Sequence, residues 1–189
     1  LMDDAGIAVF GCTTNGEFVD EVTEKGSIAI LLLDINRSYF QIYFEEYPEK
    51  NYREITNRIA QKVKERFSAP AFFIAGSNME TDAEELLFGF EDVAGKDVNV
   101  YGSMAGDDFT FADQFVFTNH NSSSRGLVCI ALDEGKIMIK GVATCGWRAV
   151  GTVRTVTKSE GNHVYTVDDT PVLDITTKYG GLENVSPDN

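Results

Sequence analysis

The chain has 189 residues, which suits one ordinary domain or two tightly joined halves of one. Hydrophobic residues make up 43% and charged residues 24%, the composition of a globular protein and not of a disordered one. Lys and Arg total 16 against 30 Asp and Glu, and the net charge of −14 disfavours nucleic acid and an anionic membrane as partners.

The cysteine pattern indicates a reducing compartment. Cys12, Cys129 and Cys145 are odd in number, widely spaced and free of any Cys-x-x-Cys, so we expect three free thiols in a cytoplasmic protein. The best apolar run, Ile28 to Leu33, is too short for a membrane span, and no signal peptide is visible. The abrupt start and the polar tail at about 182–189 predict a fragment of a longer chain.

In the first half of the chain, strands alternate with two helices. One helix is predicted to begin at Asn51, and the other at a Thr81–Glu84 capping box and to end at Gly95. The first helix carries an apolar face of Tyr52, Ile55, Ile59, Val63 and Phe67, and the second one of Leu86, Leu87, Phe90, Val93 and Ala94. The runs rich in β-branched or aromatic residues predict strands at Ile7 to Cys12, Ser27 to Leu33, Tyr39 to Phe44, Ala71 to Ala75 and Val98 to Tyr101.

After Asp108 the pattern becomes a meander of strands joined by short polar loops, which is typical of antiparallel connections. A short helix is predicted at Thr170-Pro171. The predicted strands are Gln114 to Thr118, Leu127 to Leu132, Ile137 to Thr144, Val153 to Thr157 and His163 to Val167. Together these elements predict an α+β fold with a mixed, largely antiparallel sheet, or two stacked sheets, covered by amphipathic helices. No internal boundary is visible, so residues 1–189 are expected to form one domain.

Three segments are candidates for ligand contacts. Two are turns of small residues that directly follow apolar strands, where backbone N–H groups and hydroxyls are available to a ligand. The third places the single Trp beside an Arg, a pair suited to a small organic acid. A purely structural role is the alternative for each. The candidate residues are Gly11, Cys12, Thr13 and Thr14; Gly102, Ser103, Ala105, Gly106, Asp107 and Asp108; and Trp147 with Arg148.

Cys12 is also a candidate nucleophile, which gives an enzyme as an alternative function. A thiol needs a base to generate the thiolate, and the only histidines, His120 and His163, are not placed near Cys12 by the sequence. The adjacent carboxylates Asp107 and Asp108 suggest a hard cation, but no EF-hand spacing or His-rich cluster supports one. We therefore expect a non-catalytic domain without a metal.

Several motifs together resemble those of FIST domain proteins. They run in the same order along the chain and cover most of it. The matching segments are 11–17 (GCTTNGE), 102–108 (GSMAGDD), 146–151 (GWRAVG), 156–165 (VTKSEGNHVY) and 168–173 (DDTPVL). The chain resembles the N-terminal FIST part followed by the start of the C-terminal part.

This resemblance implies an intracellular sensory domain of signal transduction that binds a small polar, amino-acid-like molecule. It also implies a signalling partner such as a kinase or a chemotaxis component, and no cofactor. Some family members resemble haem-based gas sensors, and here His120, His163 or an exposed Cys would have to supply the axial ligand. A protein-interaction module is a further alternative.

The positions of the two turns predict a single site. Each turn follows an apolar strand, Ile7 to Phe10 or Val98 to Tyr101, so each emerges at the C-terminal end of a strand. If the two strands are neighbours in the same direction, the turns meet at a crevice of the kind that often holds ligands. We therefore expect Cys12, Thr13 and Thr14 near Ser103, Gly106 and Asp107 or Asp108, with Trp147 or Arg148 at the wall of the site.

Overall fold

A computed structural model of the protein describes residues 4–108, 110, 114–142, 144–146, 148–149 and 151–181. The chain divides into two compact units, Leu1–Gly141 and Val142–Asn189, and each is described by itself. The expectation of a single domain over residues 1–189 stays a prediction.

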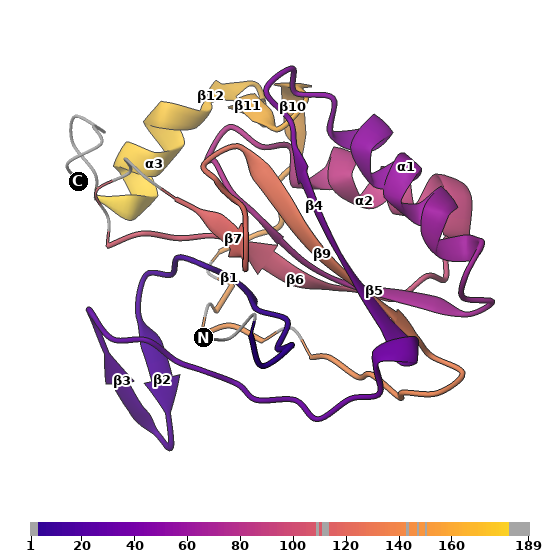
Figure 1. The fold of residues 1–189 in the computed structure, drawn as a ribbon. Coiled ribbons are helices and arrows are strands. Elements are labelled where there is room, and N and C mark those ends of the chain that lie inside the picture. Colours follow the sequence, from indigo (N-terminus) through magenta and orange to yellow (C-terminus); the bar gives the residue numbers. More distant parts are fainter. Residues whose placement is uncertain are drawn as a thin grey trace. The chain divides into compact units, whose positions relative to one another are not determined.

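The first unit is built on a four-stranded mixed sheet in the order β4-β9-β5-β6 (Figure 1). Both β4 and β5 run antiparallel to the central strand β9, which places Cys129 opposite Tyr43 on one side and Ile74 on the other. Strands β5 and β6 are parallel. The strands are β4 Phe40–Glu46, β5 Pro70–Gly76, β6 Val100–Met104 and β9 Gly126–Asp133. This arrangement confirms the predicted α+β class and the largely antiparallel mixed sheet.

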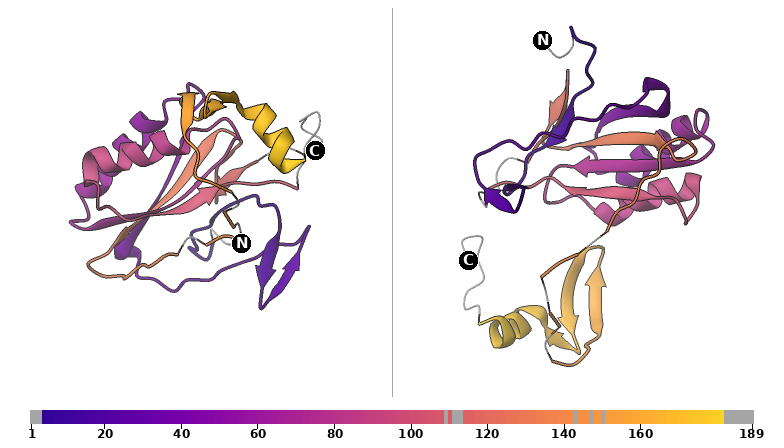
Figure 2. Two further views of the ribbon diagram at one scale, coloured as in Figure 1. Left: turned by 180° about the vertical axis from the view of Figure 1, so that it is seen from behind. Right: turned by 90° about the horizontal axis from the view of Figure 1, so that it is seen from below.

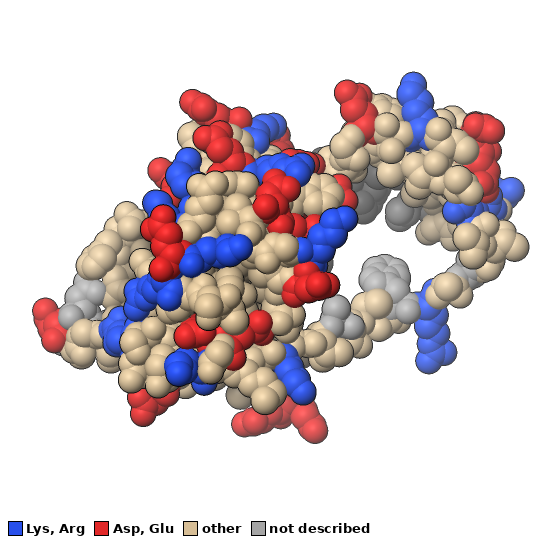
Figure 3. Space-filling view, turned by 90° about the vertical axis from the view of Figure 1, so that its right-hand side faces the viewer, with Lys and Arg blue, Asp and Glu red and all other residues tan. Residues whose placement is uncertain are grey.

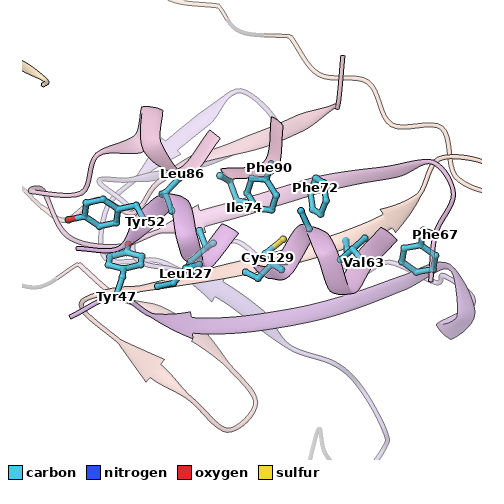
Figure 4. Close-up of a cluster of buried hydrophobic side chains, with 14 residues drawn as sticks. Tyr47, Tyr52, Val63, Phe67, Phe72, Ile74, Leu86, Phe90, Leu127 and Cys129 are labelled. Carbon is cyan, nitrogen blue, oxygen red and sulfur yellow. The ribbon is translucent and has the colours of Figure 1, made fainter. Parts of the chain in front are cut away.

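Two amphipathic helices cover one face of this sheet, α1 Tyr52–Lys64 and α2 Ala83–Ala94. Their apolar side chains interlock with those of β5 and β9 in the larger hydrophobic core (Figure 4). All five predicted core residues of the first helical segment are buried, because they recur on one face of the helix at intervals of three and four residues. Each large side chain buried in this way contributes about 1.5–3 kcal/mol relative to its exposed state. In α2 the prediction was wrong for Leu87, which is exposed.

The helix starts differ from their predictions in detail. Asn51 stands at the cap position of α1, but its side chain makes no capping hydrogen bond, and its Oδ1 is buried without a hydrogen-bond partner among the described residues. The cap of α2 is Asp82 and not Thr81, since Asp82 Oδ1 accepts from the backbone N–H groups of the first turn. The Thr81 hydroxyl instead donates to the Ser77 carbonyl oxygen at 2.8 Å. Gly95 ends α2 as expected.

The outer surface of the helical layer is a solvated, mixed-charge face. Positive and negative side chains are interspersed there (Figure 3), and several form ion pairs. Arg53 Nε lies 2.7 Å from Asp92 Oδ2, and Arg58 Nη2 lies 3.1 Å from Glu45 Oε2. Exposed pairs of this kind contribute little stability, about 0–1 kcal/mol each.

The opposite face of the sheet is covered by the N-terminal segment and a small second sheet, β1-β7-β8 (Figure 2). Its core joins Ala75 and Val128 of the main sheet to Ala105 and Val116, and Phe10 and Cys12 pack against it. The strands are β1 Phe10–Cys12, β7 Val116–Thr118 and β8 Ser122–Ser123. Strand β1 therefore pairs with β7 and not with the strand before the second turn, as the single-site expectation had supposed.

Two predicted strands are wrong. Residues 27–33 and the described part of 137–144 form no strand, although both are rich in β-branched and aliphatic residues. Residues 17–24 instead form an exposed hairpin, β2 Glu17–Val19 and β3 Val22–Glu24. A strand needs a neighbour for its backbone N–H and C=O groups. Among the described residues none pairs with 27–33, and in the second segment the Ile137 N–H donates only to the Asp133 carbonyl oxygen of the preceding turn.

The second unit is a hairpin followed by a helix. Its elements are β10 Val156–Glu160, β11 His163–Val167, β12 Thr170–Pro171 and α3 Val172–Gly180, and the helix begins next to the predicted Pro171. Arg154 fastens the helix to the hairpin turn, because it lies 3.0 Å from Asp168 Oδ2 and donates to the Tyr179 hydroxyl at 2.8 Å. None of the described residues of this unit is fully buried.

Candidate functional site

The two turns of small residues do meet in the structure. The Gly106 N–H donates to the Thr13 carbonyl oxygen at 2.9 Å, and a Cβ added to Gly106 would lie 3.1 Å from the Asn15 backbone nitrogen. The junction forms where the parallel strands β5 and β6 end, since the Ala105 N–H donates to the Gly76 carbonyl oxygen at 2.6 Å. The predicted proximity of the turns is confirmed, but it arises through the β1–β7 pairing.

The backbone N–H and the hydroxyl oxygen of Thr13 both form hydrogen bonds within the protein. Its N–H donates to the Phe115 carbonyl oxygen and its hydroxyl oxygen accepts from the Phe115 N–H, both at 2.9 Å. The next hydroxyl, of Thr14, donates to the Glu17 carboxylate, which also accepts from the Ser27 hydroxyl at 2.7 Å. These hydrogen bonds hold the pKa of Glu17 below its usual value. These hydrogen bonds join residues 13–17 to Phe115 and Ser27, so the polar groups of Thr13 and Thr14 have structural roles.

The other predicted residues differ in their burial and in the unit to which they belong. Burial raises the pKa of the half-buried Cys12 thiol, and Ala105 is buried, whereas Gly102, Ser103 and Asp108 are exposed. Asp107 is half-buried and accepts from the Thr110 hydroxyl at 3.1 Å. Trp147 lies outside the described residues, and the exposed Arg148 belongs to the second unit. Ligand contacts by any of these residues stay a prediction.

An open pocket of about 480 Å³ lies at the other end of the β1–β7 ladder. Its walls come from three segments of the first unit: the residues before β1, strand β4 with the turn preceding it, and the loop after β7. About half of the lining residues are apolar, and the others carry amide, imidazole, hydroxyl or guanidinium groups. The lining residues are Ala8, Val9, Arg37, Phe40, Gln41, Ile42, Phe44, Thr118, Asn119, His120 and Asn121.

Side-chain hydrogen bonds hold the pocket walls together. Asn119 fixes the segment before β1, because its Oδ1 accepts from the Val9 N–H at 2.6 Å and its Nδ2 donates to the Ile7 carbonyl oxygen at 2.9 Å. The Arg37 guanidinium donates to the Gly6 carbonyl oxygen and lies 5.7 Å from the centre of the Phe40 ring. Arg37 belongs to a short 3₁₀ turn, η1 Arg37–Tyr39, that leads into β4. The Arg37 guanidinium is therefore held beside the Phe40 ring in the pocket wall.

Sequence reasoning missed this pocket. Arg37 was not singled out, and His120, which lines the pocket, was considered only as a base or as an axial ligand. A local signal does exist for the turn that carries Arg37, since Asn36 caps it by accepting from the Ser38 N–H at 2.9 Å. The approach of residues 118–121 to β4 is set by long-range pairing, which no local pattern reveals.

The described residues give no support to a metal or to haem. Among them, no group of three or more His, Cys, Asp and Glu side chains could hold a metal ion. His120 is exposed at a pocket whose loop side is polar, and His163 is exposed and stacked on Tyr165 at 4.5 Å. A haem needs an apolar slot beside its axial ligand, and the absence of a cofactor stays a prediction.

The chain belongs to the FIST family, since the model of the FIST N domain matches residues 4–170. This confirms the resemblance found in the motifs. The family is associated with sensory signal transduction. No curated protein and no solved structure gives a match to the chain. None of the helices described in the structure is long and apolar enough to cross a membrane.

Proposed function

We propose that this chain is a cytoplasmic sensory domain that binds a small, amino-acid-like molecule in the pocket beside Arg37. The observation that carries the proposal is the pocket itself. Its volume of about 480 Å³ lies within the range of small-molecule sites, and its lining combines apolar side chains with about as many polar ones. The association of the family with sensory signal transduction supports the same conclusion.

The chemistry of the lining favours a carboxylate-bearing ligand. A guanidinium has five N–H donors in a planar fork, and the Gly6 carbonyl oxygen occupies one of them in Arg37. A carboxylate matches this fork through two parallel hydrogen bonds. The side-chain amide of Asn121 supplies an acceptor for an ammonium group, and Phe40 and Phe44 suit an apolar side chain. The proposed downstream partner is a signalling protein such as a kinase or a chemotaxis component.

The properties of Cys12 favour binding over catalysis. A nucleophilic cysteine depends on its thiolate, which a lowered pKa makes available. Burial instead raises the pKa of Cys12, and the thiol packs against the apolar cluster around Val116 and Val128. For Cys12 to act as a nucleophile, a group other than the apolar side chains around it would therefore have to lower the pKa of its thiol.

A thermal-shift screen of amino acids and small organic acids tests the proposal. A ligand at 100 times its Kd stabilises the protein by about 2.7 kcal/mol, which raises the unfolding midpoint visibly. The Arg37→Gln variant should lose this shift, whereas Arg58→Gln, a matched change on the opposite face of the sheet, should keep it. If no compound shifts the wild type, or if Arg37→Gln responds like the wild type, the proposed site is wrong.

A further inference from the structure

Residues 28–33 expose an uninterrupted run of apolar side chains. Ile28, Ile30, Leu31, Leu32 and Leu33 are between 59% and 85% exposed, in the extended connection between β3 and η1 (Figure 1). Among the described residues, no backbone–backbone hydrogen bond joins this run to another segment. The run therefore presents both apolar side chains and unpaired backbone N–H and C=O groups.

This combination is the signature of a strand that lacks its neighbour. Single exposed aliphatic residues are ordinary on protein surfaces, but a contiguous apolar patch marks an interaction site. An unpaired extended segment is a template for strand addition from another chain. Because the run is continuous and does not alternate with polar residues, both of its faces require cover.

We propose that residues 28–33 pair antiparallel with the same residues of a second copy, so that the chain forms a two-fold symmetric dimer. In the central register, Ile28 lies opposite Leu33, Ala29 opposite Leu32 and Ile30 opposite Leu31. Every pair across the axis is then apolar, as a self-complementary interface requires. The inference does not depend on the ligand pocket.

The charges that flank the run select the antiparallel direction. Lys25 precedes the run and Asp34 follows it, and both are exposed. Antiparallel pairing places Lys25 diagonally across from Asp34 of the second copy at both ends of the interface, within reach of a long side chain. Parallel pairing would instead align Lys25 with Lys25 and Asp34 with Asp34. Charge complementarity thus favours a second copy in the antiparallel arrangement.

The hairpin just before the run enlarges the same apolar surface. Phe18, Val19 and Val22 of β2 and β3 are between 55% and 79% exposed. They precede residues 28–33 in the chain and are separated from them by the five residues 23–27. The strand of the second copy covers one edge of the run, and the hairpins of the two copies are available to cover its faces.

Sedimentation analysis of the whole chain over a concentration series tests the dimer. We expect the wild type to dimerise, and Leu31→Lys to weaken the dimer by about tenfold or more, because it places a charge opposite Ile30. Met138→Lys, a change at another side chain that is 80% exposed, should leave dimerisation unchanged. Circular dichroism verifies that both variants are folded. A wild type that stays monomeric up to about 100 µM, or equal weakening by both variants, would overturn the proposal.

Charge reversal tests the direction of pairing. Lys25→Asp and Asp34→Lys should each weaken the dimer at low salt, because like charges then face each other at both ends. A mixture of the two variants should form mixed dimers preferentially, since both ends then pair opposite charges. Single variants that dimerise as strongly as the wild type would exclude the antiparallel register, because parallel pairing aligns like charges in the wild type as well as in each variant.

Discussion

Gly102 in β6 is the residue at which the parallel strand pair tolerates no side chain. Its φ is +138°, and a Cβ added there would lie 1.9 Å from the Ile74 carbonyl oxygen of β5. We predict that Gly102→Ala lowers the free energy of unfolding by at least about 3 kcal/mol, because backbone and not a flexible side chain must move. Urea denaturation measures this effect.

A second glycine serves as a control that distinguishes the cost of backbone strain from the cost of the steric clash with Ile74. Gly95 also has a positive φ, but a Cβ added to it meets nothing within 4 Å among the described residues. Gly95→Ala should therefore cost less, about 1–3 kcal/mol, the cost of placing an L-residue at φ 96° and ψ 161°, a backbone region that is essentially restricted to glycine. Equal losses at both positions would show that the contact of Gly102 with Ile74 has no energetic weight.

The buried thiol of Cys129 predicts a loss of stability in alkali. Burial raises the pKa of this thiol far above its ordinary range, whereas the unfolded thiol titrates near its usual pKa of about 8.5. The unfolded state therefore releases a proton that the folded state keeps, so stability falls as pH rises above that value. Between pH 8 and pH 10 the loss from this one group is about 2 kcal/mol.

The comparison variant is Cys129→Ala, which removes the titrating group. Its free energy of unfolding should be lower at pH 8 because of the cavity, but the further decrease between pH 8 and pH 10 should be smaller by about 2 kcal/mol. Chemical denaturation at both pH values measures the difference. If wild type and variant show the same decrease with pH, Cys129 is not the buried group responsible.

At the scale of elements, the cap of α2 makes a specific contribution. Asp82 Oδ1 accepts from the Glu84 N–H at 3.0 Å and from the Glu85 N–H at 3.2 Å. Asp82→Ala should lower the free energy of unfolding by about 1 kcal/mol, as is usual for loss of an N-cap. The exposed Asp97, outside the helix, offers a control, since its replacement by Ala should change stability by less than about 0.5 kcal/mol. Equal effects would rule out capping by Asp82.

The helices were predictable because their information is local. The apolar residues from Tyr52 to Val63 recur at the helical period, and Gly95 marks the end of α2. Strand content was also readable from residue type, but strand pairing was not. Residues 27–33 and 127–132 look alike in composition, yet only the second run finds partners on both sides, in β4 and β5. Pairing is decided by distant segments, which a local pattern does not contain.

Long-range strand pairing also explains why only part of the candidate site was predictable from the sequence. Two turns placed after apolar strands predicted the meeting of Thr13 with Gly106, although the strand pairing assumed for it was wrong, since β1 pairs with β7. The pocket did not follow, because Arg37, Phe44 and Asn119 approach one another only through the long-range pairing of β4 with β9 and of β1 with β7. Small residues in turns were visible in the sequence, whereas a lone Arg before a strand carried no signal of its own.

At the scale of the whole molecule, the two units should differ in local stability. The first unit contains both hydrophobic clusters, whereas no described residue of the second unit is fully buried. Amide protection reflects the burial and contacts that must open before exchange. We predict that backbone amides of β10 and β11 exchange much faster than those of β5 and β9, as measured by hydrogen exchange. Equal protection in the two units would contradict the difference in burial.

The central claim is that a small ligand binds in the pocket beside Arg37, and chemical-shift mapping of the ¹⁵N-labelled chain tests it most directly. The probe is the most stabilising compound from the thermal-shift screen, titrated into the wild type and into Arg37→Gln. We predict that the largest shifts fall on the amides of Val9, residues 37–44 and residues 118–121, and that they disappear in the variant. Shifts centred on residues 11–16 and 102–108, or shifts that persist in Arg37→Gln, would contradict the account.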